Sequence, residues 1–111
     1  MLLNGKGVDM DKNQGAEYYK NAAEKGNVTA MFNYANMLAD DEIEQNLQLA
    51  SHYYKMAADK GHINAMKNYS YILINGEGIE HDKEEARKYY KMAADAGDME
   101  ASELYQRLDE D

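Results

Sequence analysis

Three histidines, His52, His62 and His81, are the side chains of this sequence best suited to acid–base catalysis or metal binding at neutral pH. Only His81 has carboxylates as direct neighbours, Glu80 and Asp82. Adjacent residues do not converge on one ligand, so this pattern favours solvated loops over a metal site or an acid–base pair. No Ser or Thr stands with a Lys or His in a nucleophile arrangement, and the chain has no Cys. We therefore expect no catalytic residue, no metal site and no cofactor.

Two other patterns resemble ligand-binding loops but lack the residues that would complete them. Gly-x-Gly occurs at positions 5–7 and 76–78, without the preceding strand and the following Gly-Lys-Ser/Thr of a phosphate-binding loop. The acidic runs 40–44 and 109–111 do not have the ligand spacing of a calcium-binding loop. We interpret the glycine pairs as structural turns and the acidic runs as solvated surface.

The charge balance and the apolar pattern argue against two classes of partner. Tyrosine pairs at 18–19, 53–54 and 89–90 could stack on single-stranded nucleic acid. However, 12 basic against 21 acidic residues give a formal net charge of −9, which opposes binding to phosphates. The longest strongly apolar run, residues 71–74, is far shorter than a membrane span. We expect a cytoplasmic protein that binds neither nucleic acid nor a membrane.

A repeat organises the whole chain. Three segments share a Tyr-Tyr pair, an Ala-Ala pair and a closing glycine. The glycines lie 35 and 36 residues apart, at Gly26, Gly61 and Gly97. A second marker, an alanine with a tyrosine four residues later, has the same spacing and begins at positions 30, 65 and 101. Two markers with one period indicate stacked copies of one structural unit.

Each copy is expected to contain two helices. The Tyr-Tyr segment forms a B helix, which opens on an Asp or Asn N-cap and closes on the left-handed glycine. An A helix follows at once. The helices should therefore begin near Asp11, Asn27, Asn46, His62, Asp82 and Asp98.

Small residues allow the helices to approach closely, and the tyrosines fill the remaining space. Four alanines should be almost fully buried: Ala57, Ala58, Ala93 and Ala94. The second tyrosine of each pair belongs to the core, at positions 19, 54 and 90. The first should pack at the junction with the next repeat, at positions 18, 53 and 89.

The loop between the two helices and the B helix after it resemble the Sel-one-like repeat (SLR), a relative of the tetratricopeptide repeat. The residues that carry the resemblance are Asn75-Gly76-Glu77-Gly78-Ile79, Asp82-Lys83 and the segment 86–97. Residues 4–8 are the same loop one copy earlier, whereas the middle loop, 39–43, is shorter, lacks glycines and should take a different turn. The repeat and the resemblance predict an all-α fold, a right-handed α-solenoid of stacked antiparallel helix pairs.

We expect a single solenoid domain over residues 1–111. It divides into a partial repeat over 1–26, full repeats over 27–61 and 62–97, and a partial final repeat over 98–111. Uncapped ends would expose apolar residues, at positions 1–3 on one side and at Leu104, Tyr105 and Leu108 on the other. Head-to-tail self-association through these ends is therefore expected.

The A helices of such a solenoid line its concave face, and the side chains that packing leaves free there form the candidate binding surface. Phe32 and Tyr71 are aromatics on this face, and Asn33 and Asn68 occupy equivalent positions where an amide can bind a peptide backbone. The predicted partner-binding residues are Thr29, Phe32, Asn33, Asn36, Asn64, Lys67, Asn68 and Tyr71.

The function expected from this surface is that of a non-enzymatic adaptor or scaffold that binds a partner protein or peptide on the concave A-helix face. The net charge of −9 favours a basic partner. The alternative is a structural spacer, a segment of a longer repeat array with no ligand of its own.

Overall fold

The computed structural model describes residues 4–40, 46–76 and 79–110. In these ranges the chain forms helices and no strand, as the sequence predicts. The B helices are α1 (Asn4–Glu24), α3 (Leu47–Asp59) and α5 (Lys83–Asp95). The A helices are α2 (Val28–Leu38), α4 (Ile63–Asn75) and α6 (Met99–Glu110).

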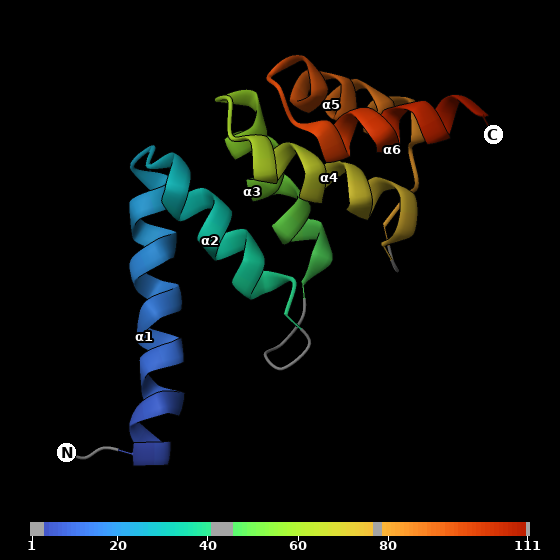
Figure 1. The fold of residues 1–111 in the computed structure, drawn as a ribbon. Coiled ribbons are helices and arrows are strands. Elements are labelled where there is room, and N and C mark those ends of the chain that lie inside the picture. The colour runs from blue at the N-terminus through green and yellow to red at the C-terminus, as the bar shows by residue number, and fades with distance from the viewer. Residues whose placement is uncertain (1–3, 41–45, 77–78, 111) are drawn as a thin grey trace.

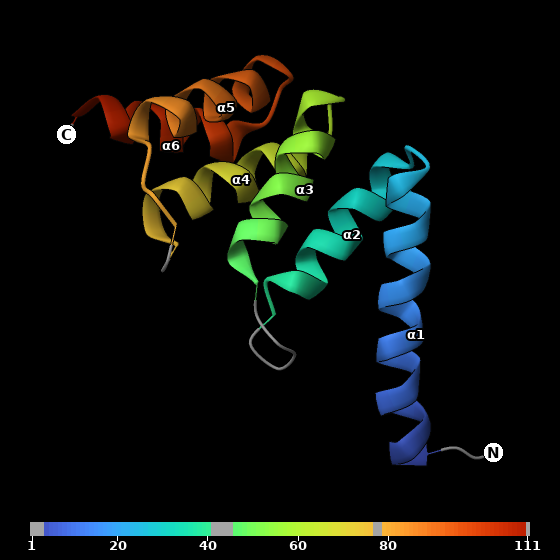
Figure 2. The same cartoon turned by 180° about the vertical axis from the view of Figure 1, so that it is seen from behind.

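The helices stack in chain order into an elongated molecule of 53 × 26 × 22 Å. Each helix packs chiefly against the helix before it and the helix after it. Figures 1 and 2 show α1 at one end of the stack and the pair α5 and α6 at the other. This arrangement confirms the predicted α-solenoid, in which each pair of helices depends on its neighbours for burial.

A glycine in the left-handed conformation ends each B helix, with φ of 98° at Gly26 and Gly61 and 106° at Gly97. At Gly61 the backbone N–H donates to the carbonyl of Ala58 at 2.9 Å, and the N–H of His62 donates to that of Ala57 at 3.1 Å. These two bonds form a Schellman motif, which satisfies the last carbonyls of the helix. His62, the residue after Gly61, already caps the following A helix, so the chain changes direction within two residues.

Side-chain N-caps confirm five of the six predicted helix starts. Each cap accepts a hydrogen bond from the backbone N–H three residues later, at Asn27, Asn46, His62, Asp82 and Asp98. His62 does so through Nδ1, at 3.1 Å from the N–H of Ala65. The ring of His62 is half-buried, and the helix terminus orients it.

The predicted start of the first helix at Asp11 is also wrong, because α1 begins at Asn4 and continues through the expected loop over 4–8. In the third repeat the equivalent loop ends at Asp82, whose backbone N–H donates to the carbonyl of Leu73 on α4 at 3.0 Å. No described A helix precedes residues 4–8 to accept such a bond. The backbone groups of this segment pair within a helix instead.

The middle loop closes like the third one although it is shorter and has no glycine. The N–H of Asn46 donates to the carbonyl of Leu38 at 2.7 Å, which corresponds to the bond between Asp82 and Leu73. Residues 41–43 of the loop for which we predict a different turn lie outside the described residues. Both described ends of the loop therefore keep the geometry of the repeat.

Alanines form the seams between the helices. Ala57, Ala58 and Ala93 are fully buried, as predicted, but Ala94 is only half-buried. Ala94 is the counterpart of Ala58 one repeat later. The pair α3 and α4, next to Ala58, is followed by α5 and α6, whereas no described helix follows α6. The prediction of near-complete burial was therefore wrong for this one alanine.

The first tyrosine of the second and third pairs packs against the A helix of its own repeat, and the hydroxyl of Tyr89 also donates to Asp59 of the preceding repeat at 2.6 Å. Tyr53 meets Tyr34 edge-on at a centroid distance of 5.0 Å, and Tyr89 meets Tyr69 in the same way at 4.9 Å. Tyr18 has no A helix before it in the described residues, and 70% of its surface is exposed. The prediction that Tyr18 is packed away was therefore wrong.

The two equivalent alanines provide a test of the packing. We expect Ala58→Leu to lower the free energy of unfolding by about 1–3 kcal/mol, because a larger side chain cannot fit a filled seam. Ala94→Leu should cost clearly less, because its site is only half-buried. Urea denaturation followed by circular dichroism measures both, and equal losses would show that the seam is not close-packed.

Candidate functional site

Residues from five consecutive helices, α2 to α6, line one groove, which we call the A-helix groove. Its volume is about 820 Å³. Helix α4 contributes the largest share because Asn64, Lys67, Tyr71 and Asn75 recur at intervals of three or four residues and so share one face. The lining consists of Phe32, Ala39, Leu47, Tyr54, Asn64, Lys67, Asn68, Tyr71, Ile72, Asn75, Gly76, Tyr90, Glu100 and Leu104.

Phe32 is held in an aromatic stack at the wall of the groove. Its ring lies 4.4 Å from the ring of His62 in a stacked arrangement, and 5.9 Å from that of Tyr54. Since the N-cap bond fixes the ring of His62, the helix terminus of α4 also positions Phe32. Phe32 is therefore a half-buried, rigid surface and not a freely exposed aromatic.

Two amides and a phenol join three helices beneath the groove. Asn36 on α2 accepts a hydrogen bond from the hydroxyl of Tyr54 on α3, and a longer one, 3.5 Å, from Nδ2 of Asn68 on α4. Burial raises the pKa of Tyr54, which therefore stays a neutral donor. This cluster fixes the orientation of Asn68, whose amide lines the groove.

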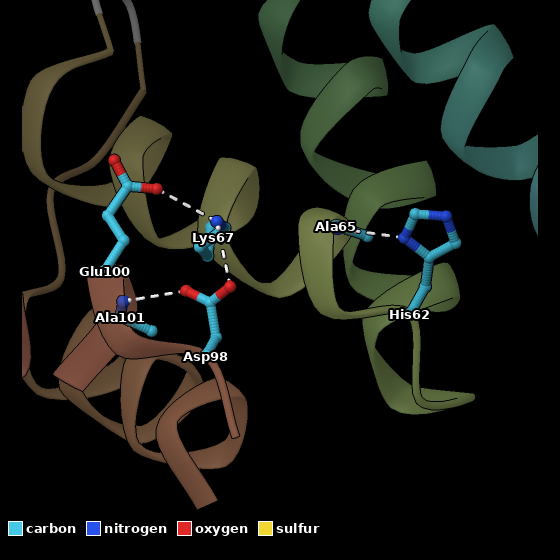
Figure 3. A network of polar contacts seen from close by, with 6 residues as sticks. All are labelled: His62, Ala65, Lys67, Asp98, Glu100 and Ala101. Carbon is cyan, nitrogen blue, oxygen red and sulfur yellow. Dashed lines mark hydrogen bonds and ion pairs between the residues drawn. The ribbon is translucent and has the colours of Figure 1, made fainter. Parts of the chain in front are cut away.

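Lys67 connects α4 to α6 (Figure 3). Its ammonium donates to Oε1 of Glu100 at 2.9 Å and to Oδ1 of Asp98 at 3.2 Å. The other carboxylate oxygen of Asp98 accepts the N–H of Ala101 at 2.8 Å and so caps α6. One carboxylate thus serves both as a helix cap and as the anchor of a lysine from the neighbouring repeat.

The charges of this cluster reinforce one another. The hydrogen bond to Glu100, and then that to Asp98, raises the pKa of Lys67 above its ordinary value. The N–H of Ala101 and the ammonium of Lys67 hold the pKa of Asp98 below its ordinary value. Burial raises the pKa of Tyr90, and the carboxylate of Glu100 and the hydroxyl of Tyr71 raise it further. Lys67 therefore stays cationic and Asp98 anionic at neutral pH.

Two further properties concern the described residues alone. Among them, no three His, Asp or Glu side chains gather closely enough to hold a metal ion. None of the described helices combines the length and the apolar composition that a membrane span requires.

The repeating unit of this fold matches that of a known protein family. A family model, the Sel1 repeat, matches residues 1–27, 28–62 and 63–98. The chain belongs to the Sel1 repeat family. Sel1 repeats generally mediate protein–protein interactions, and the family is one of non-enzymatic repeat scaffolds. Among curated proteins, none matches the sequence.

Two solved structures show the same fold. One is c5321, a protective antigen present in uropathogenic Escherichia coli strains that displays an SLR fold; it has a TM-score of 0.77 and 22% identity over 84% of this chain. The other is a Sel1 repeat protein from Oxalobacter formigenes, with a TM-score of 0.65 and 30% identity over 78% of this chain. The chain spans 20% and 36% of the lengths of these two proteins.

The structure gathers some of the predicted binding residues of this Sel1 array and separates others. Five of them line the groove: Phe32, Asn64, Lys67, Asn68 and Tyr71. Asn36 lies behind the lining, where it accepts the hydroxyl of Tyr54. Thr29 is exposed on the first turn of α2 and Asn33 is half-buried, and neither lines the groove.

Sequence reasoning missed several lining residues. Tyr54 and Tyr90 were assigned to the core, and they are buried, but one edge of each still reaches the groove. Glu100 and Leu104 belong to α6, which the prediction did not include in the surface. The repeat itself could have indicated them, because Glu100 is the counterpart of Asn64 and Leu104 that of Asn68, each 36 residues later.

The histidine cap allows a test of how the groove wall is positioned. We expect the free energy of unfolding of His62→Ala to lie about 1 kcal/mol below that of His62→Asn. Asparagine keeps an acceptor, as Asn27 does at the start of α2, where it accepts the N–H of Ala30 at 2.9 Å. Both variants lose the stack on Phe32, so their difference in urea denaturation isolates the cap. Equal stabilities would mean that the bond to Ala65 contributes nothing.

Proposed function

We propose that this Sel1 segment is an interaction module that binds a peptide segment of a partner protein in the A-helix groove. The observation that carries the proposal is the groove itself, about 820 Å³ in volume and lined by α2, α4 and α6 together with the edges of α3 and α5. The structural spacer remains the alternative, and it predicts no ligand at all for this surface.

The chemistry of the lining supports a peptide as the ligand. Asn64, Asn68 and Asn75 can each donate to and accept from a peptide backbone. Tyr71, of which 58% is exposed, and the rigid ring of Phe32 supply apolar surface for a side chain. Amides that set the backbone position, next to aromatics that gain from desolvation, are the combination found at peptide-binding surfaces.

Charge supports a basic partner over an acidic one. The net charge of −9 should accelerate association with a cationic segment, and this acceleration should decrease with added salt. Lys67 is the cation of the groove, but its contacts with Asp98 and Glu100 already compensate its charge. An acidic peptide therefore finds no uncompensated cation in this cluster.

The proposal is tested with displayed peptide libraries. Peptides selected on the wild-type chain should bind at least about tenfold more weakly to Tyr71→Ala, because a central aromatic is the strongest type of anchor. Asn68→Ala should weaken binding less, because its amide positions a backbone without supplying most of the affinity. Fluorescence anisotropy measures the dissociation constants at two salt concentrations.

Lys88→Ala is the matched control, because Lys88 is exposed on the B helix α5 and does not line the groove. Thermal unfolding should confirm that all three variants fold. Binding that is lost only in Lys88→Ala would assign the ligand to the B-helix face. A library that yields no groove-dependent peptide would favour the spacer.

A second proposal concerns the end of the stack at α1, where we expect α6 of a second copy to dock. Tyr53 and Tyr89 are covered by the tyrosine of an A helix, whereas Tyr18 is 70% exposed at the same repeat position. Tyr105 on α6 is the counterpart of the two covering tyrosines, Tyr34 and Tyr69. By repeat position, Tyr105 of one copy is therefore expected to cover Tyr18 of the next, and a head-to-tail contact of this kind need not close into a ring.

Sedimentation velocity tests this end contact. The wild-type chain should show a sedimentation coefficient that rises with concentration toward the millimolar range, and Tyr18→Ser should remain monomeric. Tyr71→Ser, which removes another exposed tyrosine away from the end, should behave like the wild type. A monomeric wild-type chain at the highest concentration would refute the proposal.

A further inference from the structure

We infer that the α6 side of the A-helix groove is a subsite for an arginine side chain of the bound segment, with Glu100 as its anion and Tyr71 as its stacking surface. This inference rests on the proposed function, because it names the side chain that the groove selects. It predicts that the groove binds a basic ligand and that Tyr71 and Glu100 determine the preference for arginine.

The lining of this side of the groove combines aromatic, apolar and anionic groups. Tyr71 on α4, Tyr90 on α5 and Glu100 and Leu104 on α6 all contribute to it. Tyr90 is buried, with 4% exposure, so it provides a fixed wall. Tyr71 and Glu100 are accessible, with 58% of the former residue and 69% of the latter side chain exposed. A ligand can therefore reach both without a rearrangement of the fold.

The carboxylate of Glu100 is the group of this cluster that a ligand can use. Lys67 contacts one of its oxygens, Oε1, at 2.9 Å, and also contacts Asp98 at 3.2 Å (Figure 3). Asp98 is committed to Lys67 and to the N–H of Ala101 and is far less exposed, at 23% of its side chain. If Glu100 turns to a ligand, Lys67 keeps Asp98 and no charge is left unpaired.

The charges of the cluster favour a cation at this place. One ammonium and two carboxylates leave one net negative charge, within a chain whose total is −9. A ligand carboxylate would face Glu100 and would have to compete with two existing acceptors for Lys67. A cation instead adds an attraction to an aromatic ring beside it.

Arginine fits these groups better than lysine does. Its guanidinium is planar, binds a carboxylate through two N–H groups and stacks on an aromatic face at the same time. The exposed residue Tyr71 on α4 and the exposed carboxylate of Glu100 on α6 border the same groove, which suits this double contact. Leu104 and the edge of Tyr90 are available to the methylene groups of the side chain.

N-acetyl-arginine amide is the probe, because it carries the side chain without requiring a peptide ligand. N-acetyl-citrulline amide is the matched control, since it has nearly the same shape but no charge. In NMR titrations of ¹⁵N-labelled protein, arginine should shift the amide signals of residues 71 and 100. It should bind at least about fivefold more tightly than citrulline, as expected for one cation–π contact and one partly exposed ion pair.

Glu100→Gln should remove this preference, because glutamine keeps the shape and an acceptor for Lys67 but not the charge. Glu103→Gln is the control for overall charge: Glu103 is exposed on the same helix and does not line the groove. It should retain the preference. Tyr71→Leu should reduce it, because an apolar surface remains but the aromatic face is lost.

Equal binding of arginine and citrulline, or an equal loss in Glu100→Gln and Glu103→Gln, would overturn the inference. Shifts confined to residues outside the groove would overturn it as well. The outcome is separable from that of the proposed function. Selected peptides that bind in the groove without any preference for arginine would refute the arginine subsite alone. Arginine binding to Glu100 without any groove-dependent peptide would refute the proposed function alone.

Discussion

The left-handed glycine that ends each B helix is the constraint on which the rest of the structure depends. Gly26, Gly61 and Gly97 take φ values near +100°, which only glycine adopts without strain. In each case the following residue, Asn27, His62 or Asp98, is both the last member of the Schellman motif and the N-cap of the next A helix. Two residues thus fix the direction of every A helix relative to the B helix before it. Fully buried alanines then hold the helices close together.

These turns between helices also position residues of the groove, because two of the cap residues contact side chains that line it. His62 caps α4 and its ring supports Phe32. Asp98 caps α6 and anchors Lys67 of the preceding repeat. The same residues therefore stabilise the solenoid and position the lining of the groove. It follows that a substitution at either cap should change the geometry of the groove even though neither residue lines it.

The features that the sequence predicts correctly are those that depend on local chemistry: the cap residues, the left-handed glycines and the spacing of the buried alanines. The start of the first helix was missed because such a loop is held by a bond to an A helix, as Asp82 forms with Leu73, and no local pattern in residues 4–8 specifies whether that bond forms. The pairing of Lys67 with Glu100 was missed for a related reason. It depends on how closely α6 approaches α4, which no local pattern specifies.

The repeat also shows where functional specificity can reside. Positions that build the solenoid hold nearly the same residue in every copy, such as Ala57 and Ala93, or Gly61 and Gly97. Positions that face the groove differ between copies: Asn64 is replaced by Glu100, and Asn68 by Leu104. Since each pair occupies one repeat position, these differences change the side-chain chemistry that the groove presents. The amides of α4 and the Glu100 and Leu104 pair of α6 therefore give the two sides of the groove different side-chain chemistry.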